Sequence, residues 1–281
     1  MVVLAFVAGA VAVGLLLVTA RGVLAHPSLQ RQNHRGRMLP TAVGILLVAG
    51  VIAVDGARTL LAMVGLGDIP TAPDRLLLLG ALVAFGFLGA VDDLLGDADD
   101  RGLRGHLVPA AHGRVTTGFV KLGGGVAVSL MLAGAADGDH AGRVLLDAGL
   151  IALAANLANL LDRAPGRTIK WALLAYVPLA VVAGAEAVGI AMGVVAGAAV
   201  ALLPGDLRER FMLGDTGANA LGAALGVGTV LSTSPEVRTA VAIVLLLLTL
   251  VSEVVSFSRI IERVPPLRGF DQLGRRRLDA R

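Results

Sequence analysis

The stretch FMLGDTGANALGAALG, residues 211–226, joins a single acid, Asp215, to the start of an otherwise uncharged run of small residues. Three other polar motifs lie at the ends of long apolar runs: PTAVG at 40–44, VDDLLGD at 91–97 and NLANLLD at 156–162. Because a charge inside the bilayer is costly, acids in such positions mark the point where a membrane helix meets water. The motifs therefore predict helices that bring their polar ends to one face of a membrane.

The composition is that of an integral membrane protein. Of 281 residues, 56% are hydrophobic and 16% are charged, and the mean hydropathy is +0.81, which is far from the average of soluble domains. The 37 glycines and the low aromatic content of 3% suit helices that pack backbone to backbone. The lack of cysteine excludes disulfides, thiolate metal sites and cysteine nucleophiles. The pI near 10.1 fits anionic headgroups, and we expect no nucleic-acid partner.

The apolar runs predict an all-α, polytopic protein with about nine transmembrane helices, since one span takes roughly 17 to 25 mostly apolar residues. The expected spans are residues 1–20, 41–54 with an extension to 66, 76–91, 119–136, 144–161, 171–184, 186–203, 217–231 and 240–257. Almost nothing separates the spans at 171–184 and 186–203, so these two could be merged or shifted. The first span lacks a cleavage-like site, and we expect it to be retained.

Basic residues fall on alternate connections between these spans. All but four of the 24 Arg and Lys residues lie on one side, and the exceptions are Arg58, Arg75, Arg143 and Arg238. The positive-inside rule makes the rich side cytoplasmic, with the N-terminus outside and the C-terminus inside. The acids at helix ends also fall on this side: Asp92, Asp93, Asp97, Asp162, Asp206 and Asp215. We divide the chain into a transmembrane domain, residues 1–258, and a basic cytoplasmic tail, residues 259–281.

Asp92 and Asp93 close an apolar helix, where two neighbouring carboxylates are costly to desolvate and the helix dipole repels anions. One interpretation is a stop signal solvated by headgroup water. The other is that Mg²⁺ or a basic partner makes the pair tolerable, because a hard cation prefers an oxygen-rich, partly hydrated setting. Adjacent helical residues point about 100° apart, so we expect the two acids to have different partners.

Asn156, Asn159 and Asp162 are three residues apart, which places them on one stripe of a helix. Such a stripe faces protein or a water-filled cavity, where it either forms hydrogen bonds between helices or contributes to a site. Arg163 and Arg167 follow directly, and they either bind a phosphate or anchor the helix in the headgroups.

Gly214, Asp215 and Thr216 open a helix, and the Asp215 carboxylate is either its N-terminal cap or a metal ligand beside N–H groups that can hold phosphate oxygens. Lys121, near the start of another apolar run, either extends to the headgroups or contacts a phosphate. The five histidines are not spaced as metal ligands, so zinc is not expected.

In this order, with helices between them, the motifs PTAVG, VDDLLGD, NLANLLD and MLGDTGANALG resemble the polyprenyl-phosphate N-acetylhexosamine-1-phosphate transferases, glycosyltransferase family 4. That family includes the phospho-N-acetylmuramoyl-pentapeptide and undecaprenyl-phosphate N-acetylglucosamine-1-phosphate transferases. The resemblance covers residues 40–226 and implies a divergent branch. It implies transfer of a sugar-1-phosphate from a UDP-sugar to a polyprenyl phosphate, with release of UMP and with Mg²⁺, at the inner (plasma) membrane in cell-wall and peptidoglycan biogenesis.

The resemblance also implies roles for single residues. Asp215 would ligate Mg²⁺, and Asp92 and Asp93 would serve the metal and the lipid phosphate nucleophile, with Asp93 as the second metal ligand. Asn159 and Asp162 would contact the nucleotide-sugar. Lys121 would contact the diphosphate. The expected catalytic acids are Asp92, Asp93, Asp162 and Asp215, and the expected substrate contacts are Asn156, Asn159, Lys121, Arg163, Arg167, Gly214 and Thr216.

Two features depart from the family pattern. After Asp162 the family usually reads Gly-x-Asp-Gly, whereas this chain has Pro165 at the position of the second acid. Residues 259–281 contain no histidine and no tenth helix, where the family often carries a histidine cluster. A catalytically altered homologue that binds a lipid-linked or nucleotide precursor, or an envelope-assembly partner, therefore stays open. So does a transporter or flippase, which would place ionisable groups at mid-membrane. The sequence leaves open the donor sugar, the lipid length and whether the chain forms a homodimer.

Overall fold

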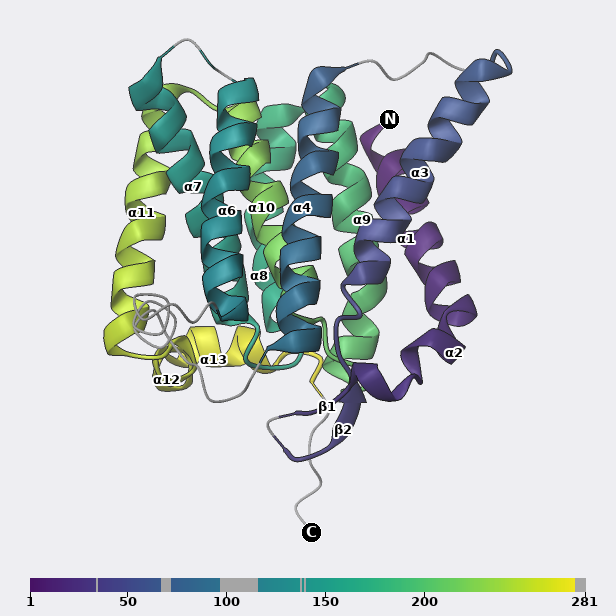
Figure 1. The fold of residues 1–281 in the computed structure, drawn as a ribbon, viewed down its shortest axis with the longest axis vertical. Coiled ribbons are helices and arrows are strands. Elements are labelled where there is room, and N and C mark those ends of the chain that lie inside the picture. Colours follow the sequence, from purple (N-terminus) through teal and green to yellow (C-terminus); the bar gives the residue numbers. More distant parts are fainter. Residues whose placement is uncertain (34, 67–71, 97–115, 137, 139, 276–281) are drawn as a thin grey trace.

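The computed structural model describes residues 1–33, 35–66, 72–96, 116–136, 138 and 140–275. Within these residues the chain is a bundle of long helices with one small hairpin (Figure 1). The long helices are α1 (Val2–Thr19), α3 (Ile45–Met63), α4 (Pro73–Leu95), α6 (Thr117–Ala136), α7 (Ala141–Leu161), α8 (Arg167–Ala183), α9 (Ala187–Leu207), α10 (Gly214–Ser232) and α11 (Pro235–Val254). The short elements are α2 (Arg21–Leu24), η1 (Pro27–Leu29), β1 (Gln30–Gln32), β2 (Met38–Pro40), α12 (Phe257–Arg263) and α13 (Pro265–Gln272).

The prediction of an all-α, polytopic membrane protein is confirmed. Among the described residues, seven helices are long and apolar enough to cross a membrane, and each overlaps an expected span. The two remaining expected spans coincide with α8 and α10, so the number of crossings and the orientation stay predictions. Helices α8 and α9 are separate, because the chain turns at Gly184 with φ of 55°.

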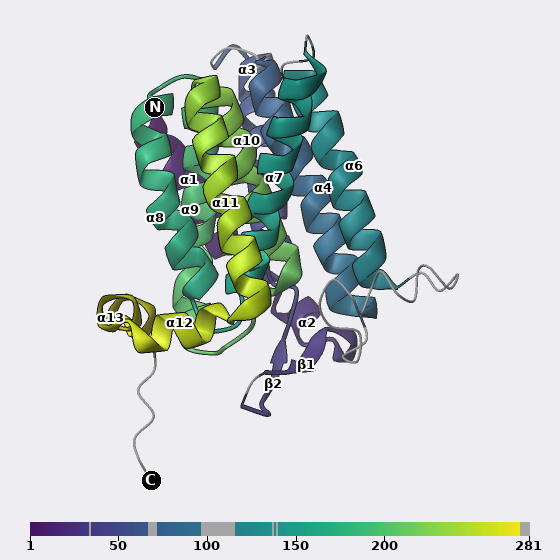
Figure 2. The ribbon, with the colours of Figure 1, turned by 90° about the vertical axis from the view of Figure 1, so that its left-hand side faces the viewer.

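Helix α10 lies at the centre of the bundle and packs against α4, α7, α8 and α9 (Figures 1 and 2). Its small residues explain this position, since they let neighbouring backbones approach closely. A Cβ atom at Gly222 would lie 2.7 Å from the Cα of Ala155 in α7, and one at Gly89 in α4 would meet the backbone of Asp215. The sequence that begins at Asp215 therefore builds both the polar site and the helix around which the others pack.

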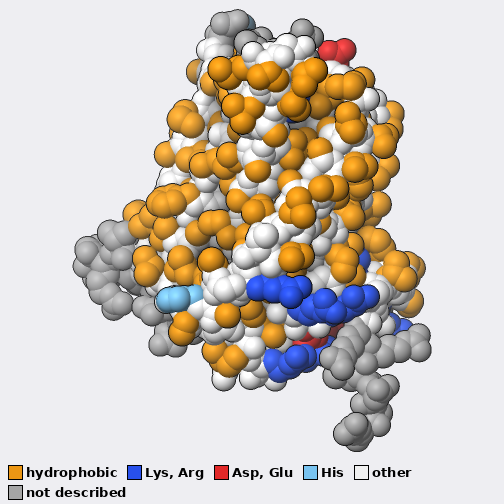
Figure 3. Space-filling model, turned by 90° about the vertical axis from the view of Figure 1, so that its right-hand side faces the viewer, with side chains coloured by type: hydrophobic (Ala, Val, Ile, Leu, Met, Phe, Trp, Pro, Cys, Tyr) orange, Lys and Arg blue, Asp and Glu red, His pale blue; other side chains and the backbone are white. Residues whose placement is uncertain are grey.

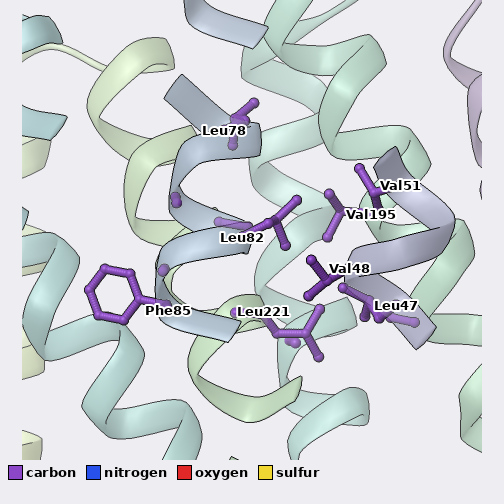
Figure 4. Packing of buried hydrophobic residues seen from close by; sticks show 14 of the residues in the cluster. Leu47, Val48, Val51, Leu78, Leu82, Phe85, Val195 and Leu221 are labelled. Atoms are coloured by element: carbon purple, nitrogen blue, oxygen red, sulfur yellow. The ribbon is translucent and has the colours of Figure 1, made fainter. Parts of the chain in front are cut away.

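Apolar side chains fill the interior and also cover the flanks. Leu47 of α3, Leu82 of α4, Val195 of α9 and Leu221 of α10 meet in one buried cluster (Figure 4). Helix α11 has no buried residue although its mean hydropathy is 2.1. An apolar flank extends over most of the molecule's height, and Lys and Arg side chains gather near one end (Figure 3). This surface suits a bundle that is surrounded by lipid.

The β1–β2 hairpin and the PTAVG motif lie at the polar end, next to the start of α10. The hairpin is antiparallel and pairs Arg31 with Leu39. Pro40 accepts a hydrogen bond from the backbone N–H of Met212 at 2.8 Å, and Gly44 donates to Leu213 at 2.9 Å. The PTAVG and FMLGD segments are thus joined by backbone hydrogen bonds.

Part of the expected basic tail is folded. Residues 257–272 form α12 and α13, and α13 packs against the first turns of α8. Phe270 meets Trp171 edge to face with 5.2 Å between ring centroids, and Lys170 lies over the same ring. Residues 276–281, the rest of the expected tail, lie outside the described residues.

Candidate active site

The ends of four helices meet in one polar cluster centred on Asp215. Lys121, in the first turn of α6, donates to Asp92 Oδ2 at 3.0 Å and also to Asp215 Oδ2. Asn159 Nδ2, near the end of α7, donates to the same Asp215 oxygen at 2.8 Å and to Asn219 at 3.2 Å. About a quarter of each charged side chain in this cluster is exposed, so the cluster stays accessible from the polar end.

Asp93 holds the first turn of α10. Its Oδ1 accepts the backbone N–H of Asp215 at 3.0 Å, and its Oδ2 accepts the N–H of Thr216 at 2.9 Å and the Thr216 hydroxyl at 2.6 Å. A Cβ atom at Gly214, where φ is +76°, would lie 2.5 Å from the Asp93 carboxylate. Asp93 rather than Asp215 therefore satisfies the free N–H groups of this helix start.

The expectation that Asp92 and Asp93 have different partners is confirmed. Asp92 faces Lys121, and Asp93 faces the backbone of α10. Asp97, the last acid of the same motif, lies outside the described residues.

Asp162 follows the last residue of α7, and its Oδ1 accepts the Thr168 hydroxyl at 3.1 Å. Burial raises the pKa of Asp162 well above its usual range, and the charges of Asp206 and Asp215 raise it further. Asn156 is exposed, lies one helical turn before Asn159 and, within the described residues, has no hydrogen bond to the charged cluster. Of the predicted stripe, the structure thus brings Asn159 and Asp162 to the site and leaves Asn156 outside it.

A cavity of about 300 Å³ opens between these helix ends. Five acids and one arginine line it: Asp93, Asp162, Asp206, Glu209, Asp215 and Arg163. Pro165 lines the same cavity, and Asp206 of α9 accepts the N–H of the adjacent Gly166 at 2.9 Å. Sequence reasoning placed Asp206 on the polar side but not in the site. The available signal was an acid just past the end of an expected span.

Arg167, an expected substrate contact, is part of the folded interior. It is 2% exposed, and its Nε and Nη2 donate to the two oxygens of Asp271 in α13 at 2.8 and 3.0 Å. Its Nη1 donates to Ser258 at 2.8 Å. The guanidinium is fully engaged, so the geometry corrects the expectation of a phosphate contact here. Arg163 is exposed and lines the cavity.

The residues present fit a partly hydrated Mg²⁺ ion. Within the described ranges, no group of three or more acidic or histidine side chains is arranged to hold a metal on its own. Mg²⁺ usually keeps several waters and takes one or two carboxylates plus substrate phosphates, so it needs no such group. The cavity offers several carboxylates against a single arginine, and the Lys121 ammonium lies between Asp92 and Asp215. This excess of carboxylate oxygen suits a hard cation.

No family model matches the chain. Among curated proteins, it is similar to the phospho-N-acetylmuramoyl-pentapeptide-transferase of Desulfitobacterium hafniense (strain DSM 10664 / DCB-2), with 28% identity over 233 residues. The alignment covers 70% of this chain and 63% of that protein. The similarity supports a distant relation to the transferase family that the four motifs resemble.

Proposed function

We propose that this protein transfers a sugar-1-phosphate from a UDP-sugar to a polyprenyl phosphate at the cytoplasmic face of the plasma membrane and releases UMP, in cell-envelope glycan synthesis such as that of peptidoglycan. The observation that carries the proposal is the cluster in which Asp92, Lys121 and Asn159 converge with Asp215 beside an acid-lined cavity. The distant similarity to a phosphosugar transferase supports it.

In this reaction an oxygen of the lipid phosphate attacks the phosphorus that bears the sugar. The bond from that phosphorus to the oxygen of UMP breaks, and a lipid diphosphate sugar forms. Phosphoryl transfer depends on positioning and on neutralising charge more than on a protein nucleophile. Lys121 would neutralise charge on the donor diphosphate, and Asp92 would orient the acceptor phosphate and take its proton. Asn159 would keep the Asp215 carboxylate pointing into the site.

A bound Mg²⁺ would supply further neutralisation of the diphosphate. Asp215 and Asp162 are the residues that we expect to hold it, because both carboxylates line the cavity. Asp93, expected from the sequence as a second metal ligand, instead uses both carboxylate oxygens to hold the first turn of α10. We therefore assign Asp93 a positioning role.

The test is Mg²⁺-dependent UMP release from a panel of UDP-sugars with undecaprenyl or decaprenyl phosphate. Asp215→Asn should lower release by about 10²- to 10³-fold, in the range found when a key electrostatic group is removed. Glu236→Gln, at an exposed acid at the other end of the bundle, should leave release unchanged. Equal rates for wild type and Asp215→Asn would refute the assignment.

A catalytically altered homologue is the second candidate, because Pro165 lines the cavity where the family usually has an acid. This reading predicts that the purified protein binds a UDP-sugar or a polyprenyl phosphate but releases no UMP with any donor. Asp206 beside Gly166 supplies a carboxylate to the same part of the cavity, which favours the enzyme.

A further inference from the structure

A second concave site, with basic walls, adjoins the acid-lined cavity. It is a groove of about 630 Å³ lined by Arg37, Arg208, Arg210, Glu209, Leu39 and Gly274. Arg37 precedes β2, and Arg208 and Arg210 belong to the connection from α9 to α10. The three arginines are exposed.

A buried acid organises the groove. Glu209 is 5% exposed and bonds to three residues of the hairpin segment: Arg35 at 2.8 Å, Asn33 at 3.2 Å and Arg37 at 3.7 Å. Its φ is 51°, the left-handed conformation with which many helices end: the N–H of Glu209 donates to Asp206 at 2.9 Å and that of Arg210 to Gly205 at 3.0 Å. This anchored turn holds Arg208 and Arg210, on either side of Glu209, against the same groove as Arg37.

Two of these arginines are left free for a ligand. Within the part of the chain that the structure describes, the side chains of Arg208 and Arg210 have no hydrogen bond or ion pair. Arg37 pairs with Glu209, but it shares that carboxylate with Arg35, so the groove has a net positive lining. Arginine presents a planar fork of donors that matches a phosphate, and charge-assisted bonds of this kind are the strong ones.

We infer that Arg37, Arg208 and Arg210 form a phosphate-binding groove separate from the acid-lined cavity. The groove shares Leu39 and Glu209 with the cavity, so one bound molecule could extend from one into the other. Its phosphate comes either from a soluble nucleotide or from a phospholipid headgroup, because the groove lies at the polar end, between the hairpin segment and the end of α9 (Figure 1). The inference does not depend on transfer activity.

The first experiment measures binding of inorganic pyrophosphate by calorimetry, with the protein in phosphatidylcholine nanodiscs. EDTA is present, so that the acid-lined cavity holds no divalent cation that could attract the anion. Arg208→Gln/Arg210→Gln should bind about tenfold more weakly than wild type, since each loses charge-assisted hydrogen bonds. The matched control, Arg259→Gln/Arg263→Gln, removes two exposed arginines of α12 and should bind like wild type.

The second arm counts phosphatidylglycerol that stays bound after transfer into neutral detergent, for the same three proteins. A loss of pyrophosphate binding in the groove variant identifies the soluble source, and a loss of retained phosphatidylglycerol identifies the headgroup. If the groove variant matches wild type in both arms, with an unchanged melting temperature, the inference is wrong. A protein that binds pyrophosphate through this groove but releases no UMP would leave the inference standing and refute the proposed transferase.

Discussion

At the scale of single residues, two neighbouring acids have opposite surroundings. Asp92 is paired with an ammonium group at a partly exposed position, whereas Asp93 accepts three hydrogen bonds from α10. The sequence alone could predict that they diverge, because helix geometry separates their directions. It could not predict which acid would cap α10, since the partner lies 122 residues further along the chain.

The first prediction separates the two acids by stability. Asp93→Asn should lower the free energy of unfolding by about 1–3 kcal/mol, because an amide cannot accept with both terminal atoms and one buried donor loses its partner. Asp92→Asn should change it by less than about 1 kcal/mol, as expected for a partly exposed ion pair. Thermal unfolding of the purified proteins measures both. Equal losses would contradict the capping role of Asp93.

The second prediction concerns pH. Burial, together with the charges of Asp206 and Asp215, raises the folded-state pKa of Asp162 above that of the unfolded chain. The folded state then binds the proton more tightly than the unfolded chain does. The free energy of unfolding therefore falls as the pH rises from the unfolded-state pKa of Asp162 through its folded-state pKa. Without Mg²⁺, Asp162→Asn should therefore melt at a higher temperature than wild type at neutral pH. The difference between the two melting temperatures should become smaller toward pH 4. A variant less stable than wild type at neutral pH would show that Asp162 stabilises the fold.

At the scale of elements, the sequence predicted the helix positions but missed the contacts between distant segments. The nine apolar runs each fall on a long helix of the described chain, because apolar length is a local property. The hairpin at 30–40 and the packing of α13 on α8 were not predicted, since Arg167 and Asp271 are 104 residues apart. The sequence predicts a basic tail at 259–281, because it does not show that Asp271 of this segment pairs with Arg167.

The third prediction tests that packing. Burial raises the pKa of Asp271, but the hydrogen bond and charge of Arg167 and the charge of Arg275 lower it more, so the acid is ionised at neutral pH. Its contribution to stability is lost only as the pH falls below the ordinary range for aspartate. Asp271→Ala should cost about 3–5 kcal/mol, because the charge of Arg167 stays buried without its partner. Arg167→Ala should cost less, because Asp271 still accepts from Arg275 Nη2 at 2.7 Å. The double variant should cost clearly less than the sum, and additive losses would show that the two side chains are not coupled.

At the scale of the whole molecule, the candidate site and the basic groove lie at the same end of the bundle. The apolar flanks and α11, in which no residue is buried, suit contact with lipid, while the acid-lined cavity and the basic groove adjoin each other at the polar end. A lipid acceptor would approach such a site from the side, and a soluble donor would approach from water. The proposed reaction requires that the polar end face the cytoplasm, where nucleotide-sugars are found.

The fourth prediction is that the polar end of the bundle faces the cytoplasm. The chain has no cysteine, so single cysteines can be labelled without background. In intact cells, a membrane-impermeant maleimide should label Ser234→Cys at the start of α11. It should label Gln272→Cys in α13 only after the cells are permeabilised, as the positive-inside rule requires. The reverse pattern would place the site outside the cell and remove it from its donor.

In the proposed reaction the sugar moves together with its phosphate, so a label on that phosphorus distinguishes it from transfer of the sugar alone. A UDP-sugar labelled at the phosphorus next to the sugar is incubated with the purified protein, Mg²⁺ and polyprenyl phosphate, and the lipid and aqueous products are separated. We expect the label to enter the lipid and unlabelled UMP to be released, and Asp215→Asn to lower both by about 10²- to 10³-fold. Label recovered in UDP would mean transfer of the sugar alone, and would contradict the account.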